Sequence, residues 1–277
     1  MPKCWSRRSL LKLASLAFPA STVGFASGSV GFEPAAEENS RQPEPVPDLF
    51  PTQPPELARE MVTVAHFDLK RVQELVEARP SLARASWDWG FGDWEDALGG
   101  ASHMGNRPIA EYLISKGARP TLFSAAMLGH LEVVQAFVAA QPGVQRIRGP
   151  HSITLLAHAK AGGEASRPVF DFLKSLGDAD ADPPVPLSES DANALKGTYA
   201  FGRGASQRID LTVDRGQLVW TRKGMMGRPL THLGARAFSP WGAPAVRIRF
   251  AEAGSSMMMT ITDPEVVLVA RRTPEQK

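Results

Sequence analysis

Apolar residues recur at helical spacing between residues 56 and 178. The clearest stretch is residues 117–142, GARPTLFSAAMLGHLEVVQAFVAAQP, in which an apolar stripe follows Gly129. A glycine at that place suits a left-handed turn between two helices, because a β-carbon disfavours this backbone conformation. The stripe predicts a second helix with one apolar face, formed by Val133, Val134, Phe137 and Val138. One helix pair cannot bury that face alone, so neighbouring pairs must stack on it.

The same segment resembles the ankyrin repeat, whose unit reads T-P-L-H-x-A-A-x-x-G-H-x-E-V-V-x-x-L-L-x-x-G-A. Ala125 and Ala126 fall on the paired alanines, Gly129 and His130 on G-H, and residues 132–134 on E-V-V. Weaker copies occupy residues 58–80, 94–118 and 153–178. The resemblance implies an α-solenoid of about four ankyrin units. It also implies a protein-binding face, formed by the fingers between repeats and by the first helix of each unit.

From residue 187 the apolar and polar residues alternate instead, which is typical of half-buried strands. RIDLTVD and QLVWTR, joined by Arg215-Gly216, predict a hairpin, and AVRIRF, MMMTIT and EVVLVARR alternate likewise. A small antiparallel β-sandwich or barrel of about six to eight strands would close such a set. Through L-x-G-x-Y at Leu195, Gly197 and Tyr199, this tail loosely resembles the small β domain appended to serine-β-lactamase-like proteins.

The N-terminus has the features of an export signal. SRRSLLK, at residues 6–12, places an arginine pair before an apolar run that ends in small residues, and it resembles the twin-arginine signal. The run is short and interrupted for a membrane span, so we expect no stable span after signal removal and a periplasmic or secreted product. The predicted fold class is α and β in separate domains. The predicted parts are a signal peptide (1–28), a Pro-rich linker (29–55), an ankyrin-repeat domain (56–178), a second linker (179–186) and a small β domain (187–277).

Charge and cysteine content narrow the function classes. The net charge is +2, but Lys3, Arg7, Arg8 and Lys12 all lie in the leader, so the exported part is slightly acidic and nucleic-acid binding is not expected. The single cysteine, Cys4, also lies in the leader. Disulfides, thiolate catalysis and cysteine-ligated zinc are therefore excluded for the exported chain.

The sequence contains few patterns that indicate catalysis or metal binding. No G-x-S-x-G occurs, and the six histidines form neither H-x-x-x-H nor H-E-x-x-H. His151 and His158 are seven residues apart, but Gly149-Pro150 favours a loop around His151. Asp88 and Asp93 could act as an acid and a base, yet Asp93 also suits a helix N-cap. We therefore predict no catalytic residue, metal or cofactor, with an unrecognised hydrolase as one alternative.

Residues 87–94, WDWGFGDW, hold three of the six tryptophans and fall where the second ankyrin unit would have its finger. Exposed aromatic side chains are frequent anchors of protein interfaces, although these rings could instead pack against the next repeat or the β domain. We predict recognition of an unidentified, exported protein partner. The candidate contact residues are Trp87, Trp89, Phe91 and Trp94, with Arg107, Met127 and His130 as weaker candidates.

The β domain supplies the competing hypothesis. It would hold an apolar small molecule among Trp220, Met225, Trp241 and Met258. The methionine pair at 225–226 and the triplet at 257–259 could also offer thioether ligands to Cu(I). Against copper, Met257, Met259 and Ile261 alternate as one face of a strand, where methionine fills a core.

Overall fold

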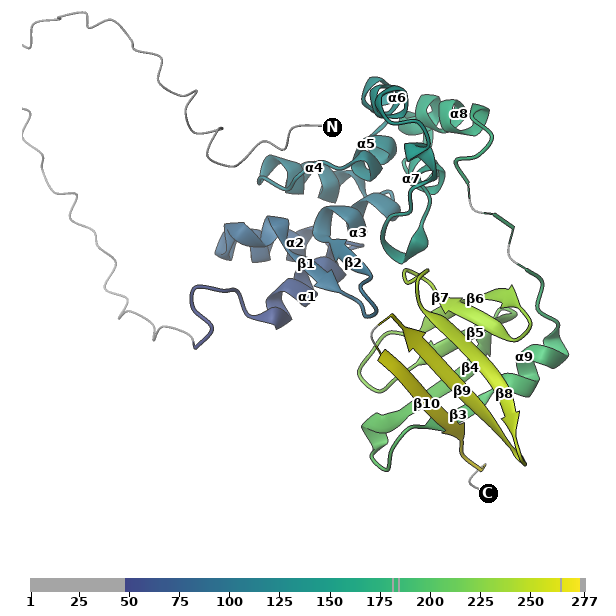
Figure 1. The fold of residues 1–277 in the computed structure, drawn as a ribbon. Coiled ribbons are helices and arrows are strands. Elements are labelled where there is room, and N and C mark those ends of the chain that lie inside the picture. The colour runs from purple at the N-terminus through teal and green to yellow at the C-terminus, as the bar shows by residue number, and fades with distance from the viewer. Residues whose placement is uncertain (1–47, 181, 184, 265, 275–277) are drawn as a thin grey trace, which may run out of the picture. The chain divides into compact units, whose positions relative to one another are not determined.

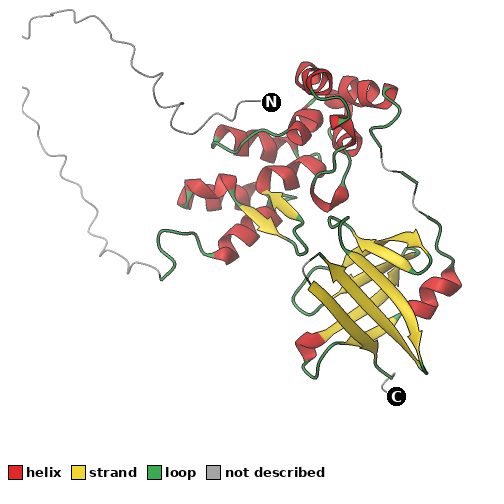
Figure 2. Ribbon diagram, in the orientation of Figure 1, coloured by secondary structure: helices red, strands yellow, loops and turns green. Residues whose placement is uncertain are grey.

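The computed structural model describes residues 48–180, 182–183, 185–264 and 266–274. A helical region comes first and a closed barrel of eight antiparallel strands follows (Figures 1 and 2), which confirms the predicted class of α and β in separate regions. The proposed signal peptide and most of the first linker lie outside the described residues. Among the described helices, none has the length and apolar character needed to cross a membrane.

Four successive helix pairs make up the helical region (Figure 1). A two-stranded hairpin, β1 (Ser86–Asp88) and β2 (Trp94–Asp96), separates the first pair from the second. Two 3-10 turns, η3 (Val144–Arg146) and η4 (Pro150–Ser152), precede the fourth pair. The pairs are α1 (Pro55–Val64) with α2 (Leu69–Ala78), α3 (Ala97–His103) with α4 (Arg107–Ser115), α5 (Leu122–Leu128) with α6 (Leu131–Ala140), and α7 (Leu155–Ala161) with α8 (Arg167–Ser175).

Side-chain caps fix where most of these helices begin. The side chains of Asp68, Asn106 and Thr154 each accept a hydrogen bond from a backbone N–H in the first turn, which satisfies a donor that has no partner inside the helix. The cap of α3 is Asp96, whose carboxylate accepts from Gly99 N. The prediction that Asp93 caps this helix is therefore wrong, because β2 continues the chain in extended form to Asp96.

The first helices of the pairs stack in a row, since α1 contacts α3, α3 contacts α5, and α5 contacts α7. This close approach depends on small residues: Ala101, Ala125 and Ala126 are buried where the helices meet. Gly129 has the expected left-handed backbone, with φ 80°, and a β-carbon there would lie 2.1 Å from the carbonyl oxygen of Ala165. The turn glycine is therefore required by both backbone conformation and packing.

The barrel follows a short helix, α9 (Glu189–Leu195), and has the strand order β10-β3-β4-β5-β6-β7-β8-β9. Of the two predicted closures, the structure is a barrel rather than a sandwich. Met257, Met259 and Ile261 are buried in its core, as the alternation on that strand predicted. The strands are β3 (Gly197–Ala200), β4 (Arg208–Asp214), β5 (Gln217–Thr221), β6 (Arg228–Gly234), β7 (Ala237–Pro240), β8 (Arg247–Ala253), β9 (Ser256–Asp263) and β10 (Val266–Arg272).

The turn glycine gives a first testable prediction. Gly129→Ala adds left-handed strain of about 1–2 kcal/mol and also forces a carbon against a backbone oxygen. Gly117→Ala is the matched control, because its φ of +90° brings the same strain but no atom lies within 4 Å of the added carbon. Urea unfolding should show a loss of stability for Gly129→Ala that exceeds the loss for Gly117→Ala by about 1–3 kcal/mol. Equal losses of stability in the two variants would mean that the close approach of Gly129 to Ala165 does not affect stability.

Candidate metal centre

Four side chains from four separate elements meet in the helical region. His66 follows α1, Glu95 lies on β2, His103 ends α3, and His151 lies in η4. One nitrogen or oxygen atom from each of them lies within 4.8 Å of the others. Figure 1 shows how this occurs, because β1 and β2 lie beside α1 and α3, and the contacts of these elements agree.

The carboxylate of Glu95 is the middle of the cluster. It is buried, and its Oε1 lies 2.9 Å from His103 Nε2. The second oxygen, Oε2, accepts a 2.8 Å hydrogen bond from the indole N–H of Trp89. Oε2 also lies 3.5 Å from His66 Nε2 and 3.4 Å from His151 Nε2. Three imidazoles therefore present the same nitrogen to one carboxylate.

Hydrogen bonds on the far side of two rings fix this orientation. His66 Nδ1 lies 2.9 Å from the carbonyl oxygen of Val62, and a carbonyl can only accept, so Nδ1 carries the hydrogen. His151 Nδ1 donates in the same way to the carboxylate of Asp93, at 2.8 Å. Metal-binding histidines usually donate their second ring N–H to a carbonyl or carboxylate, which holds the ligand nitrogen in place. Both partners are of that kind here.

The spacing of the donor atoms suits a small metal ion. A tetrahedral zinc with Zn–N bonds of about 2.0–2.1 Å holds neighbouring ligand atoms about 3.3 Å apart. The Nε2 atoms of His66 and His103 lie 3.1 Å apart, and the distances from Glu95 to the three rings run from 2.9 to 3.5 Å. His103 approaches Oε1 of Glu95 and the other two rings approach Oε2, so binding of all four groups to one zinc requires side-chain movement within this 4.8 Å cluster.

The pKa shifts favour the negatively charged form of Glu95 and the positively charged form of His151. Burial raises the pKa of Glu95, but hydrogen bonds from His103 and His151 outweigh it and lower the pKa to about 2. Burial lowers the pKa of His151, but Asp93 and Glu95 outweigh it and raise the pKa to about 9. For His66, burial is the larger effect and lowers the pKa. Without metal, a buried carboxylate is thus balanced by an imidazolium.

The fold of the WDWGFGDW segment places two acidic side chains, Asp93 within it and Glu95 directly after it. Gly90, Phe91 and Gly92 all have positive φ, which folds the hairpin tightly between β1 and β2. On β2, successive residues face opposite sides, so Glu95 points into the cluster while Trp94 is 64% exposed. The two glycines therefore explain how Trp89, Asp93 and Glu95 reach one site.

Two further residues shape the surroundings. A β-carbon on Gly100 would lie 2.9 Å from the ring of His66, so only glycine at this position of α3 leaves room for that ligand. His158 is fully buried beside His103, with ring centroids 6.4 Å apart, and donates from Nδ1 to the carbonyl of Thr154. Burial lowers the pKa of His158 to about 4, so it stays neutral at pH 7.

The predicted aromatic contact residues separate into different environments. Trp94 is exposed, and Trp87 is half-buried with Arg59 over its ring. Phe91 packs against Trp220 of the barrel core, with ring centroids 5.6 Å apart. Trp89 donates to Glu95 and thus belongs to the candidate metal centre. Neither alternative for this segment, partner contact or internal packing, describes all four side chains.

The weaker candidates are likewise dispersed. Arg107 donates to Glu111 and to the carbonyl of Leu128, and His130 is exposed before α6. Met127 is fully buried in the helical core, so its side chain is not accessible to a partner.

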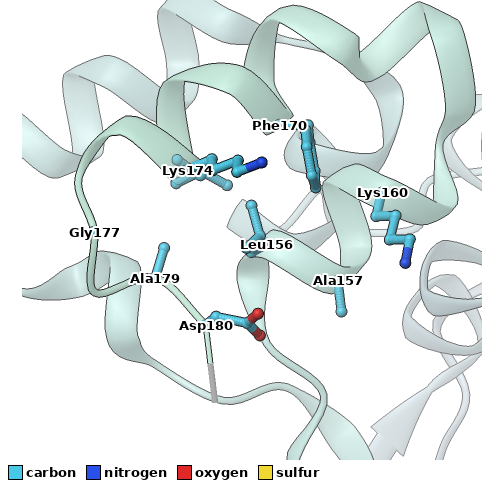
Figure 3. A pocket seen from close by; sticks show the side chains of 9 residues that line it. Leu156, Ala157, Lys160, Phe170, Lys174, Gly177, Ala179 and Asp180 are labelled. Carbon is cyan, nitrogen blue, oxygen red and sulfur yellow. The ribbon is translucent and has the colours of Figure 1, made fainter. Parts of the chain in front are cut away.

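The residues of the small-molecule hypothesis also differ in surroundings. Trp220 is buried in the barrel core, Met258 is half-buried, and Met225 and Trp241 are exposed. A pocket of about 450 Å³ lies elsewhere, between α7 and α8, and contains none of the predicted site residues. Figure 3 shows Lys160, Phe170 and Lys174 around it.

Sequence reasoning missed the histidine cluster because it searched for ligands at helical spacing. His66 and His103 are 37 residues apart, and His151 comes later still, so no local motif joins them. A signal was present: His66 and His103 occupy corresponding places at the ends of the first helices of two neighbouring pairs. Stacked repeats bring such positions side by side.

The charge balance predicts how the metal-free protein responds to pH. A raised histidine pKa contributes stability that is fully present below its ordinary value of 6.5 and is lost as pH rises through about 9. Chelator-treated protein should therefore lose stability over this range, and His151→Gln should remove that loss. The contribution of Glu95 is lost at far lower pH, near 2. Urea unfolding from pH 6 to 9.5 measures the effect, with His130→Gln as a control that should keep the wild-type slope.

Comparison with known proteins adds no family. No family model matches the chain, and a search of the curated proteins found no match. The fold is therefore described only as a helical region followed by an eight-stranded antiparallel barrel. The ankyrin resemblance and the resemblance to the small β domain of serine-β-lactamase-like proteins both rest on sequence motifs.

Proposed function

We propose that the helical region binds a divalent transition metal, with zinc as the best fit, through His66, Glu95, His103 and His151. The observation that carries this proposal is the convergence of three Nε2 atoms on one buried carboxylate within 4.8 Å. Imidazole nitrogen and carboxylate oxygen suit zinc, and a cysteine-free site is compatible with an exported protein.

A metal explains the contacts better than hydrogen bonding alone. Because His66 Nδ1 carries a hydrogen, the neutral ring has only a lone pair on Nε2, which faces His103 Nε2 at 3.1 Å. His103 Nε2 lies close to Glu95 Oε1 as well, at 2.9 Å. One proton on His103 cannot point well at both neighbours, whereas a cation between the rings attracts all three groups.

The ligand set favours a structural role for the metal. Four protein ligands complete a tetrahedral zinc site, whereas catalytic zinc sites keep one position for water or substrate. The ligands come from the turn after α1 and from β2, α3 and η4, so one ion would join segments that are distant in sequence. We therefore propose that the metal stabilises the helical region and does not carry out a reaction.

Metal analysis tests this proposal directly. The purified chain should bind one zinc ion, and zinc should raise the melting temperature, because a ligand that binds only the folded state stabilises it. Glu95→Gln and His103→Ala should each weaken zinc binding by about 100-fold or more. Elemental analysis gives the stoichiometry, and the absorption spectrum of the Co²⁺-substituted protein reports the coordination geometry.

Two histidine variants serve as controls for that experiment. His130→Ala removes an exposed imidazole before α6, and His232→Ala removes one from the barrel. Both should keep the wild-type stoichiometry and affinity. If they weaken zinc binding as much as His103→Ala, or if the wild type binds no metal, the proposed centre is wrong.

We also propose that the helix pairs form an ankyrin-type array that recognises an exported protein partner. The stacking of α1, α3, α5 and α7, with left-handed glycines at two turns, supports the array. The specific support for recognition is Trp94, a large aromatic side chain that is 64% exposed on the hairpin between two pairs. On the exported chain, this surface would meet periplasmic or secreted proteins.

Capture from a periplasmic extract tests the recognition proposal. Trp94→Ala should abolish capture of a partner without lowering the melting temperature, because the side chain makes little buried contact. Trp241→Ala is the matched control, since it removes a tryptophan that is 39% exposed on the barrel and should leave capture intact. Unchanged capture by Trp94→Ala would count against this surface.

A further inference from the structure

Asp93 connects the metal centre to the barrel. Its Oδ2 accepts a hydrogen bond from His151 Nδ1 at 2.8 Å and another from the guanidinium of Arg228 at 3.0 Å. Arg228 lies at the start of β6, so one oxygen atom joins a metal ligand to the barrel. Asp93 and Arg228 are only 3% and 4% exposed. A buried ion pair of this kind depends on the position of both partners.

The loop that carries His151 makes a second connection. Ser152 Oγ accepts a hydrogen bond from Gly242 N, which lies just after β7. Gly242 also approaches Asp93 so closely that a β-carbon there would lie 2.2 Å from the carboxylate. The barrel therefore contacts both Asp93 and Ser152, which lie beside His151. Arg228 makes the first contact with its side chain, and Gly242 makes the second with its backbone N–H.

The same loop is strained. His151 and Ser152 are consecutive non-glycine residues with left-handed backbones, at φ 57° and 60°. Such a conformation persists only where surrounding contacts hold it in place. Polar contacts from the loop to distant parts of the chain include those to Asp93, to Glu95 and to Gly242. A metal bound by His151 would add a strong bond to this set.

We propose that metal binding at this centre fixes the loop of residues 149–152 and thereby holds the barrel against the helical region, with Asp93 as the positioning residue between them. This inference rests on the proposed metal site and adds a regulatory role to it. Metal on His151 Nε2 fixes the ring, the ring fixes the Asp93 carboxylate through Nδ1, and the carboxylate holds Arg228. In the metal-free protein, the strained loop lacks this bond, and its contacts with the barrel through Ser152 and Asp93 open more often.

Hydrogen exchange of the full chain measures this coupling. The amide of Gly242 donates across the contact, so its exchange should slow by about 10-fold or more when zinc replaces a chelator. The backbone hydrogen bonds between β8 and β9 lie within the barrel, so the amides that form them should exchange equally with zinc and with chelator. Zinc content is measured on the same samples. Bound zinc with unchanged exchange at Gly242 would overturn this inference alone, whereas the absence of zinc would overturn the proposed site itself.

Variants identify the route of the coupling. Arg228→Gln and the milder Ser152→Ala should both keep one zinc per chain while reducing the zinc-dependent protection of Gly242. Asp93→Asn should reduce this protection and also weaken zinc binding by about 10- to 100-fold, because it supports a ligand histidine. Arg236→Gln is the control, since its pair with Glu252 lies on the barrel surface. Full protection in Arg228→Gln and Ser152→Ala would contradict the proposed route, even if Asp93→Asn fails to fold.

Discussion

A buried carboxylate in the helical region constrains everything around it. Glu95 is almost fully shielded from water, and a charge in that position is stable only when donors or cations surround it. Trp89 and the three imidazoles of His66, His103 and His151 meet this requirement. The tight hairpin, the absence of a side chain on Gly100 and the left-handed loop at His151 all serve to bring these groups to one carboxylate.

Local pattern was sufficient to predict the secondary structure of both regions. The alternation of Met257, Met259 and Ile261 reflects the burial of one face of a strand. The stripe after Gly129 correctly predicted a helix, α6, but of its four residues Val134 alone is fully buried, whereas Val133 and Phe137 are exposed. The prediction failed at Asp93, where a good capping residue lies in the hairpin turn just before β2, and Asp96 at the end of that strand caps the helix. Two competent caps three residues apart cannot be distinguished without the hairpin.

The candidate metal centre could not be predicted in the same way. Its ligands are brought together by the stacking of helix pairs and by a loop, and neither leaves a fixed spacing in the sequence. The aromatic composition of WDWGFGDW predicts one shared role for its side chains. In the structure, Phe91 packs on the barrel, Trp89 binds the central carboxylate and Trp94 faces solvent. The tight turn at residues 90–92 separates Trp89 and Phe91, and the pleat of β2 turns Trp94 to the face opposite Glu95.

That pleat has a thermodynamic consequence for the molecule. Trp94 and Glu95 are neighbours in the chain but face opposite sides of β2, so the outer surface and the inner ligand share a single peptide unit. Free-energy linkage between two sites works equally in both directions. A partner that binds better to the metal-bound position of the hairpin would therefore raise the affinity for metal by the same factor by which bound metal raises the affinity for that partner.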